Sequence, residues 1–297
     1  MFFIANHPIY NHPLPEGHRF PMLKYELLPK QLLHEGTAEC TDFYSPDSID
    51  LSLVHAVHTV SYVKALTELT LDAKAVRSIG FPLSAALVER ELRIAQGTVV
   101  GCNHALENGI AFNIAGGTHH AFSDRGEAFY LLNDQAIAAQ YLINQKKCHK
   151  ILIVDLDVHQ GNGTAEIFQN NADVITFSMH GQSNYPFRKE TSDYDIALPD
   201  KTDDTTYLSI LQETLPELLN IHRPDFVFYL AGVDILGTDK LGKLGCTLEG
   251  CKTRDSYVLG LCKSLGIPVQ VSMGGGYSPA IKTIIEAHAN TYRVARA

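Results

Sequence analysis

The most informative stretch of this 297-residue chain is Ile151-Leu-Ile-Val-Asp155-Leu-Asp157-Val-His159-Gln-Gly161-Asn162-Gly163-Thr164. Its four leading apolar residues predict a strand that is buried on both faces inside a parallel sheet. The polar residues that follow alternate along the chain, so Asp155, Asp157 and His159 point to the same side. Ligands of open α/β sheets bind at the carboxyl ends of the strands. We therefore predict that Asp157 and His159 bind Zn²⁺ or another divalent metal.

An acidic residue at the end of a strand can also simply cap the helix that follows. That interpretation accounts for one aspartate. It leaves unexplained the occurrence of three metal-binding residue types within five positions, closed by Gly161-Asn162-Gly163. The metal-site interpretation is therefore preferred.

The size and composition of the chain predict one large domain over residues 1–297. A hydrophobic content of 45% and a charged content of 19% are ordinary for a protein with a substantial core. The sequence has no Pro/Gly/Ser-rich linker, low-complexity tract or internal repeat that would divide it. α/β folds of this length often form a single domain.

Charge and cysteine content restrict the partners and the compartment. The net charge of −9, without a cluster of Lys and Arg, argues against direct nucleic-acid binding. We predict reduced thiols and a cytoplasmic location, because the cysteines include no CxxC pair. Cys246 and Cys251 could form a metal pair, but two ordinary small residues are the simpler interpretation. The N-terminus does not resemble a signal peptide, and no apolar stretch approaches the ~18 residues of a membrane span.

Strand and helix patterns alternate along the chain, which predicts βαβ units and a parallel sheet with helices on both faces. We expect a three-layer α/β/α architecture with a mostly parallel central sheet. The predicted strands are Phe2–Ala5, Ile110–Ile114, Ile151–Val154, Val174–Ser178, Phe226–Leu230 and Val269–Ser272. The predicted helices are Leu83–Glu107, Asn133–Gln145, Asp204–Ile221, Leu248–Leu265 and Pro279–Ala289.

Four of the predicted strands end in glycine together with His, Asp or Tyr. The segments that follow them are Gly116-Gly-Thr-His-His120, Asp155–His159, Ala231-Gly-Val-Asp234 and Gly274-Gly-Gly-Tyr277. Because the carboxyl ends of parallel strands meet at one edge of a sheet, we predict that these segments form a single active site there.

A catalytic zinc site has three protein ligands and an open position for water or substrate. Asp157, His159 and Asp234 provide these three, the last from a different strand. Asp234 could alternatively cap the helix that follows it. His119 and His120 can divide the proton chemistry, one acting as a base while the other holds charge. Each imidazole needs a partner on its other ring nitrogen, and Asp155 and Asn162 are candidates.

Tyr277 follows three glycines and can offer its hydroxyl to a developing oxyanion, although an aromatic residue that starts a helix would look the same. A metal site, a histidine base and a tyrosine donor together favour amide hydrolysis.

At this point the chain resembles the zinc-dependent histone deacetylase family of the arginase/deacetylase superfamily. The similar segments run in the order typical of the family and span nearly the whole chain. They are His18–Met22, Gly116–Ala121, Phe129–Asp134, Asp155–Thr164, Ser178–His180, Ala231–Gly242 and Gly274–Tyr277. Residues 231–242, followed by Lys252-Thr-Arg-Asp255, look most similar to class IV deacetylases and their bacterial relatives.

The resemblance implies a role for each residue of the predicted active site. Asp157, His159 and Asp234 would be the zinc ligands. His120 would be the general base and then the general acid, with His119 as its electrostatic partner. Asp155 would orient His119, Asn162 would orient His120, and Tyr277 would bind the carbonyl oxygen of the scissile amide.

The resemblance also implies an acyl-lysine tunnel and a second cation. Phe129, with Tyr185 or Phe187, would form the tunnel wall, and Arg19 matches an arginine at the tunnel floor. A structural K⁺ would be held by backbone carbonyls and the Asp155 side chain. The carbonyls belong to Asp155, Asp157, His159, Ser178 and Met179.

Two residues of the matching segments differ from class I members of the family. Asn162 stands where they have Asp, so His120 should titrate at lower pH because an amide raises its basicity less than a carboxylate would. Thr118 stands where they have Trp, which would open the pocket.

The leading functional hypothesis is removal of acyl groups from lysine in proteins or peptides. The alternative enzyme is a deacylase of a small molecule such as an acetylpolyamine, and the acidic net charge suits either cationic substrate. A catalytically inactive acyl-lysine-binding scaffold would lack a ligand, the base or the tyrosine, all of which are present. A manganese ureohydrolase would need a second set of bridging aspartates. The choice between zinc and iron, the acyl chain length and the oligomeric state stay open.

Overall fold

An eight-stranded sheet runs through the computed structural model, which describes residues 2–297. The strands lie in the order β2-β1-β3-β8-β7-β4-β5-β6, and all neighbouring pairs are parallel. The strands are β1 (Ile4–Ala5), β2 (Phe43–Tyr44), β3 (Ile110–Asn113), β4 (Ile151–Asp155), β5 (Val174–Gly181), β6 (Tyr194–Leu198), β7 (Phe226–Leu230) and β8 (Val269–Ser272).

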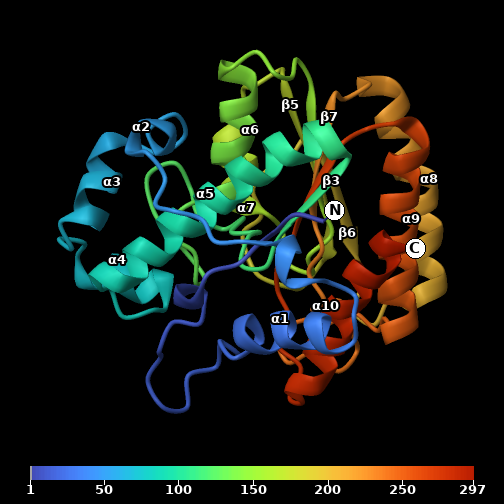
Figure 1. Cartoon of the computed structure of the whole chain (residues 1–297), viewed down its shortest axis with the longest axis horizontal. Coiled ribbons are helices and arrows are strands. Elements are labelled where there is room, and N and C mark those ends of the chain that lie inside the picture. The colour runs from blue at the N-terminus through green and yellow to red at the C-terminus, as the bar shows by residue number, and fades with distance from the viewer. Residues whose placement is uncertain (1) are drawn as a thin grey trace.

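Helices cover both faces of this sheet, with α5 and α6 on one side and α8 and α9 on the other (Figure 1). The prediction of a three-layer α/β/α architecture is confirmed, and the sheet is parallel throughout. The helices are α1 (Lys24–His34), α2 (Leu51–Val54), α3 (Val60–Thr67), α4 (Ala73–Ile79), α5 (Ala85–Asn108), α6 (Asp134–Asn144), α7 (Asn162–Phe168), α8 (Asp204–His222), α9 (Leu248–Leu265) and α10 (Ile281–Arg296).

The central strands form the core because both of their faces are covered. Every residue of β4, β5, β7 and β8 is buried. Each Val, Leu, Ile or Phe side chain buried in this way contributes ~1.5–3 kcal/mol relative to an exposed one. The apolar runs at 151–154 and 226–230 therefore favour the middle of the sheet for these strands, because both faces are covered there.

The edges of the sheet were the least predictable from sequence. Strand β6 alternates between exposed and less exposed positions, as expected at an edge, and it pairs with an extension of β5 to Gly181. The predicted strand ended at Ser178, three residues before the observed end at Gly181. Strands β1 and β2 are only two residues long.

Side-chain caps set the helix starts. Ser84 Oγ accepts a hydrogen bond from Leu87 N (3.1 Å), and Asn133 Oδ1 accepts one from Ala136 N (3.0 Å). Such caps satisfy backbone donors that lack a partner in the first turn.

The predicted end of the last helix, Ala289, is wrong. Helix α10 continues to Arg296. Its final turns are held by Arg293, whose Nη2 donates to Glu35 Oε2 at the end of α1 (2.6 Å).

No helix within residues 2–297 combines the length and the apolar character that a membrane span requires. All six cysteines are free thiols, and Cys246 and Cys251 are both buried. Neither belongs to a cluster of metal-binding side chains in the described part of the chain.

Because His58 is buried in its neutral form, we expect the free energy of unfolding to fall in mild acid. Its Nδ1 lies 2.9 Å from Phe122 O, and its Nε2 accepts from Asn133 N (3.0 Å), an arrangement that suits only the neutral ring. Burial lowers the pKa of His58 to about 4. The unfolded chain binds the proton near pH 6.5 and the folded one near pH 4, so this contribution to stability is present above pH 6.5 and disappears as the pH falls to 4.

We expect the titration of His58 to lower the free energy of unfolding of the wild-type protein by about 2 kcal/mol between pH 7 and pH 5, since each pKa unit is worth ~1.4 kcal/mol. Urea unfolding at both pH values measures it. His58→Gln, which cannot titrate, should show a smaller difference. Equal pH dependence of the two proteins would contradict the assignment.

Candidate active site

Four adjacent strands, in the order β3-β8-β7-β4, bring the predicted site together. Each contributes the segment that follows its carboxyl end, and these segments meet at one edge of the sheet. The predicted catalytic and metal-binding residues are all buried: His119, His120, Asp155, Asp157, His159, Asn162, Asp234 and Tyr277.

Asp157, His159 and Asp234 form a compact cluster whose candidate ligand atoms all lie within 4.8 Å of one another. His159 Nδ1 lies 3.1 Å from Asp157 Oδ1 and 3.2 Å from Asp234 Oδ2. One nitrogen and two carboxylate oxygens therefore face a common point, as a three-ligand zinc site requires.

The outer oxygen of each carboxylate is already bound to the backbone. Asp157 Oδ2 accepts from Gly275 N (2.8 Å), and Asp234 Oδ1 accepts from Val158 N (2.9 Å). The inner Asp234 Oδ2 is buried and accepts no well-formed hydrogen bond within residues 2–297, although His159 Nδ1 lies 3.2 Å away. An unpaired buried carboxylate oxygen is costly, and a metal cation at this point would satisfy it. The donor set thus fits zinc.

Charge at the cluster leads to the same conclusion. Burial, with the neighbouring Asp157, raises the pKa of Asp234 to about 7. Burial opposes a charge on His159, but Asp157 and Asp234 outweigh it and raise its pKa to about 10. The two carboxylates therefore strongly favour positive charge at this place, which a divalent cation supplies.

The adjacent histidines have different partners. His119 Nδ1 lies 2.7 Å from Asp155 Oδ2, and His120 Nδ1 lies 2.6 Å from Asn162 Oδ1. Burial opposes the charged form of His119, but Asp155 and Asp157 outweigh it and raise its pKa. Burial and the neighbouring His119 and His159 hold the pKa of His120 well below its usual range. His120 is therefore the imidazole that is free to accept a proton at neutral pH.

Tyr277 reaches the site because glycines precede it. A Cβ atom at Gly275 would clash with Asp234 Oδ2, and Gly274 has a φ of +70°. The loop can therefore pass directly over the carboxylates, while Tyr277 N donates to Asp239 Oδ2 (2.6 Å). Burial, with Asp157 and Asp234, holds the pKa of Tyr277 well above its usual range, so its hydroxyl stays protonated and can donate.

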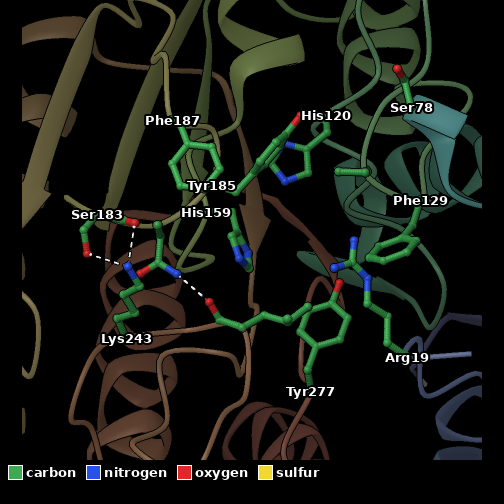
Figure 2. Close-up of a pocket in the computed structure, with 13 residues that line it drawn as sticks. Arg19, Ser78, His120, Phe129, His159, Ser183, Tyr185, Phe187, Lys243 and Tyr277 are labelled. Atoms are coloured by element: carbon green, nitrogen blue, oxygen red, sulfur yellow. Dashed lines mark hydrogen bonds between the residues drawn. The ribbon is translucent and has the colours of Figure 1, made fainter. Parts of the chain in front are cut away.

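A pocket of about 390 Å³ leads to His120, His159 and Tyr277 (Figure 2). Phe129 forms one wall, in a loop in which both Ala128 (φ +46°) and Phe129 (φ +79°) are left-handed. Such strain in non-glycine residues persists only where the surroundings enforce it. Here Ala128 N and Phe129 N donate to the backbone at the end of α4 (2.9 and 2.6 Å).

Tyr185 lies opposite, with its ring perpendicular to that of His120 at 5.1 Å between centroids. Its hydroxyl donates to Glu127 (2.5 Å). Phe187 also lines the pocket but is 92% exposed, so it lies at the mouth and does not form a closed wall.

The predicted position of Arg19 at the tunnel floor is wrong. Arg19 lines the pocket but is exposed, with its guanidinium 5.0 Å from the centre of the Phe129 ring, so it lies at the mouth. The buried cation of this segment is Lys24, whose Nζ donates to Gly274 O (3.0 Å). Arg19 precedes α1 on a surface loop, whereas Lys24 begins the helix that packs beneath the Tyr277 loop.

The residues predicted to hold a structural cation include two members of the metal cluster, Asp157 and His159. Asp155 and Ser178 are partners in the β4–β5 register. Asp155, Asp157, His159, Ser178 and Met179 are all buried. Potassium binding at this place stays a prediction.

One supporting residue, Arg254 on α9, was not predicted to belong to the site, although it lies in the segment that resembles class IV deacetylases. Arg254 Nη1 donates to Gly232 O (2.6 Å) and Leu156 O (3.2 Å), carbonyls next to the two strand ends that carry the metal-binding aspartates. Asp255 accepts from Arg254 Nε (2.9 Å). The sequence alone does not predict the contacts of Arg254 with these carbonyls, because they depend on how α9 packs against the sheet.

We expect Arg254→Met to lower the free energy of unfolding by ~3–5 kcal/mol, because it leaves the buried Asp255 without its cation. Zinc affinity should fall by ~10–100-fold, as for residues that support metal ligands. Urea unfolding and zinc titration measure the two effects. Unchanged zinc affinity in a folded variant would show that the strand ends do not need this support.

Comparisons with known proteins agree with this geometry. The family model described as the histone deacetylase domain matches residues 18–292. An uncharacterized protein of Picosynechococcus is 46% identical over 295 residues, covering 99% of this chain and 98% of that protein. Histone deacetylase 2 of Arabidopsis thaliana is 28% identical over 279 residues, covering 90% of this chain and 72% of that protein.

Solved structures show the same fold. An HDAC homolog from Aquifex aeolicus superposes with a TM-score of 0.85 at 22% identity, covering 99% of this chain and 83% of that one. An HDAC homolog complexed with SAHA gives a TM-score of 0.86 at 21% identity, covering 99% and 84%.

Proposed function

Because this chain belongs to the histone deacetylase domain family, we propose that it is a zinc-dependent amidohydrolase acting on acyl-lysine in proteins or peptides. It would remove acetyl or longer acyl groups from the ε-amine, with residues 1–297 as a single catalytic domain. The observation that carries the proposal is the Asp157–His159–Asp234 cluster beside a low-pKa His120 and a protonated Tyr277.

Asp157, His159 and Asp234 would hold the zinc. When bound, zinc supplies a Lewis acid that polarises the amide carbonyl and makes water more acidic. His120 would take a proton from the attacking water and then deliver a proton to the lysine nitrogen as the C–N bond breaks. His119, charged beside Asp155, would stabilise negative charge, and Tyr277 would donate a hydrogen bond to the oxyanion. The products would be a carboxylate and a free lysine amine.

The finer assignments are also part of the proposal. We infer similarity to class IV deacetylases from residues 231–242 and 252–255, a structural K⁺ at Asp155, and a cytoplasmic location from the unpaired cysteines.

The substrate is tested by profiling the zinc-loaded protein against lysine peptides carrying acetyl to myristoyl groups and against acetylated polyamines. Turnover of at least one acyl-lysine peptide supports the proposal. Turnover of polyamines alone would replace it with small-molecule deacylation, and binding without turnover would favour an inactive scaffold.

Tyr277→Phe should depress kcat by ~10²–10³-fold with little change in KM, because the hydroxyl would stabilise charge that develops chiefly in the transition state. Steady-state kinetics on an acetyl-lysine peptide measures this.

The phenyl ring is retained in this variant, so zinc content and unfolding should match the wild-type protein. Tyr141→Phe, on the partly exposed face of α6, is the matched control and should be fully active. Near-normal kcat in zinc-loaded Tyr277→Phe would mean that another donor or the metal alone polarises the carbonyl.

A further inference from the structure

The mouth of the pocket is positively charged, although the whole chain carries a net charge of −9. Thirteen residues line the pocket, and apart from histidines its charged members are Arg19 and Lys243. No carboxylate belongs to this lining in the described chain. Figure 2 shows Arg19 and Lys243 on opposite sides of the opening, with His159 and Tyr277 between them.

Both cations are available to a ligand. Lys243 is exposed, and its Nζ donates to Ser183 O and Ser183 Oγ (both 3.1 Å). Arg19 is exposed and rests on the Phe129 ring. Within residues 2–297 neither forms a salt bridge. The exposed Asp200 forms no direct salt bridge with Lys243, but it accepts from the Ser183 hydroxyl that Lys243 Nζ also contacts.

Two acidic side chains beside the pocket residues, Glu127 and Asp239, already accept several hydrogen bonds. Glu127 accepts from Tyr185 and from Arg125 Nε (3.0 Å). Asp239 accepts from the backbone N–H groups of Leu241, Gly242 and Tyr277 (2.8, 2.9 and 2.6 Å). Lys189 adds further positive charge on the Lys243 side, where its Nζ donates to Asn184 O and Pro186 O (both 2.6 Å).

We propose that this mouth selects acyl-lysine residues flanked on either side by Asp or Glu, and disfavours acetylated polyamines. The inference rests on the proposed deacylase function and narrows its substrate class. A polyamine brings its remaining ammonium groups to a pocket lining with two cations and, within residues 2–297, no carboxylate, so like charges repel. An extended peptide instead places its neighbouring carboxylates near Arg19 and Lys243. It can also cover the exposed ring of Phe187.

The test uses three peptides that differ only in the residues flanking acetyl-lysine, which are Glu, Gln or Lys on both sides. N8-acetylspermidine is the fourth substrate. We expect kcat/KM to be about tenfold higher for the Glu peptide than for the Lys peptide at low salt, since several exposed charge pairs of modest strength act together. The ratio should shrink at high ionic strength because the mouth is open to solvent. Fluorescence anisotropy of labelled peptides measures the same preference as binding.

Lys243→Glu should reduce the Glu-to-Lys preference severalfold, and Lys243→Gln should give an intermediate value. The matched control is Lys263→Glu, which makes the same charge change on the exposed end of α9. That end leads into the start of β8, at the edge of the sheet away from the site, so the preference should be unchanged.

Two kinds of failure are distinguishable. Absence of turnover with all three acetyl-lysine peptides would overturn the proposed function, while the anisotropy measurement would still decide the charge preference. Equal or better use of the Lys peptide or N8-acetylspermidine, or a preference that Lys243→Glu leaves unchanged, would overturn this inference and leave the deacylase proposal intact.

Discussion

Asp157→Ala, His159→Ala and Asp234→Ala are each expected to abolish hydrolysis and to lower the zinc content of the protein. Each substitution removes one of three ligand atoms that face a common point. Binding free energy at such a site depends on the full ligand set. The loss of activity should therefore exceed the ~10–100-fold effect of residues that only support metal ligands.

Metal analysis of the purified variants and kinetics on an acetyl-lysine peptide measure both effects. The apoprotein of Asp234→Ala should stay folded, because the substitution relieves a buried carboxylate whose pKa is raised to about 7. Asp47→Ala, at an exposed position, is the matched control and should retain zinc and activity. A fully active Asp234→Ala enzyme would remove that residue from the site.

His120→Ala should reduce kcat by ~10²–10⁴-fold, the usual contribution of general acid–base catalysis. Its ring is the one whose pKa is held well below the usual range, so it is unprotonated when the reaction begins. Asn162→Ala should reduce kcat by only ~10–100-fold, because Asn162 orients His120 through a 2.6 Å hydrogen bond but does not itself exchange the proton.

Kinetics of the two variants, with zinc content measured in parallel, tests this order. Both variants should keep their zinc, since neither residue belongs to the ligand cluster. If His119→Ala proves more damaging than His120→Ala, the roles assigned to the two histidines are reversed.

Local patterns alone were enough to predict the architecture and to nominate the ligand cluster. Apolar runs such as 151–154 and 226–230 are typical of strands inside a parallel sheet, and the alternation with helical patterns supported that choice. Alternation along an extended chain places Asp157 and His159 on the same side. Asp234 and Tyr277 could be added because their strands end in the same combination of glycine and polar residues.

The properties that depend on distant parts of the chain came from the tertiary structure. The order β3-β8-β7-β4 brings four separate segments into contact, and no local pattern specifies that order. The two histidines are adjacent in the sequence, yet their pKa values shift in opposite directions. Asp155 and Asp157 outweigh burial at His119, whereas burial and the neighbouring His119 and His159 lower the pKa of His120.

The sequence alone also did not predict that the mouth of the pocket is positively charged. The net charge suggested a cationic substrate, but Arg19 and Lys243, 224 positions apart in the numbering, lie on opposite sides of one opening. Arg19 matched a motif that implied burial, whereas the surface loop that carries it leaves it exposed. Electrostatic interaction falls off with distance through space and is screened by solvent. Both quantities are set by how the chain packs, so composition and motif order do not determine them.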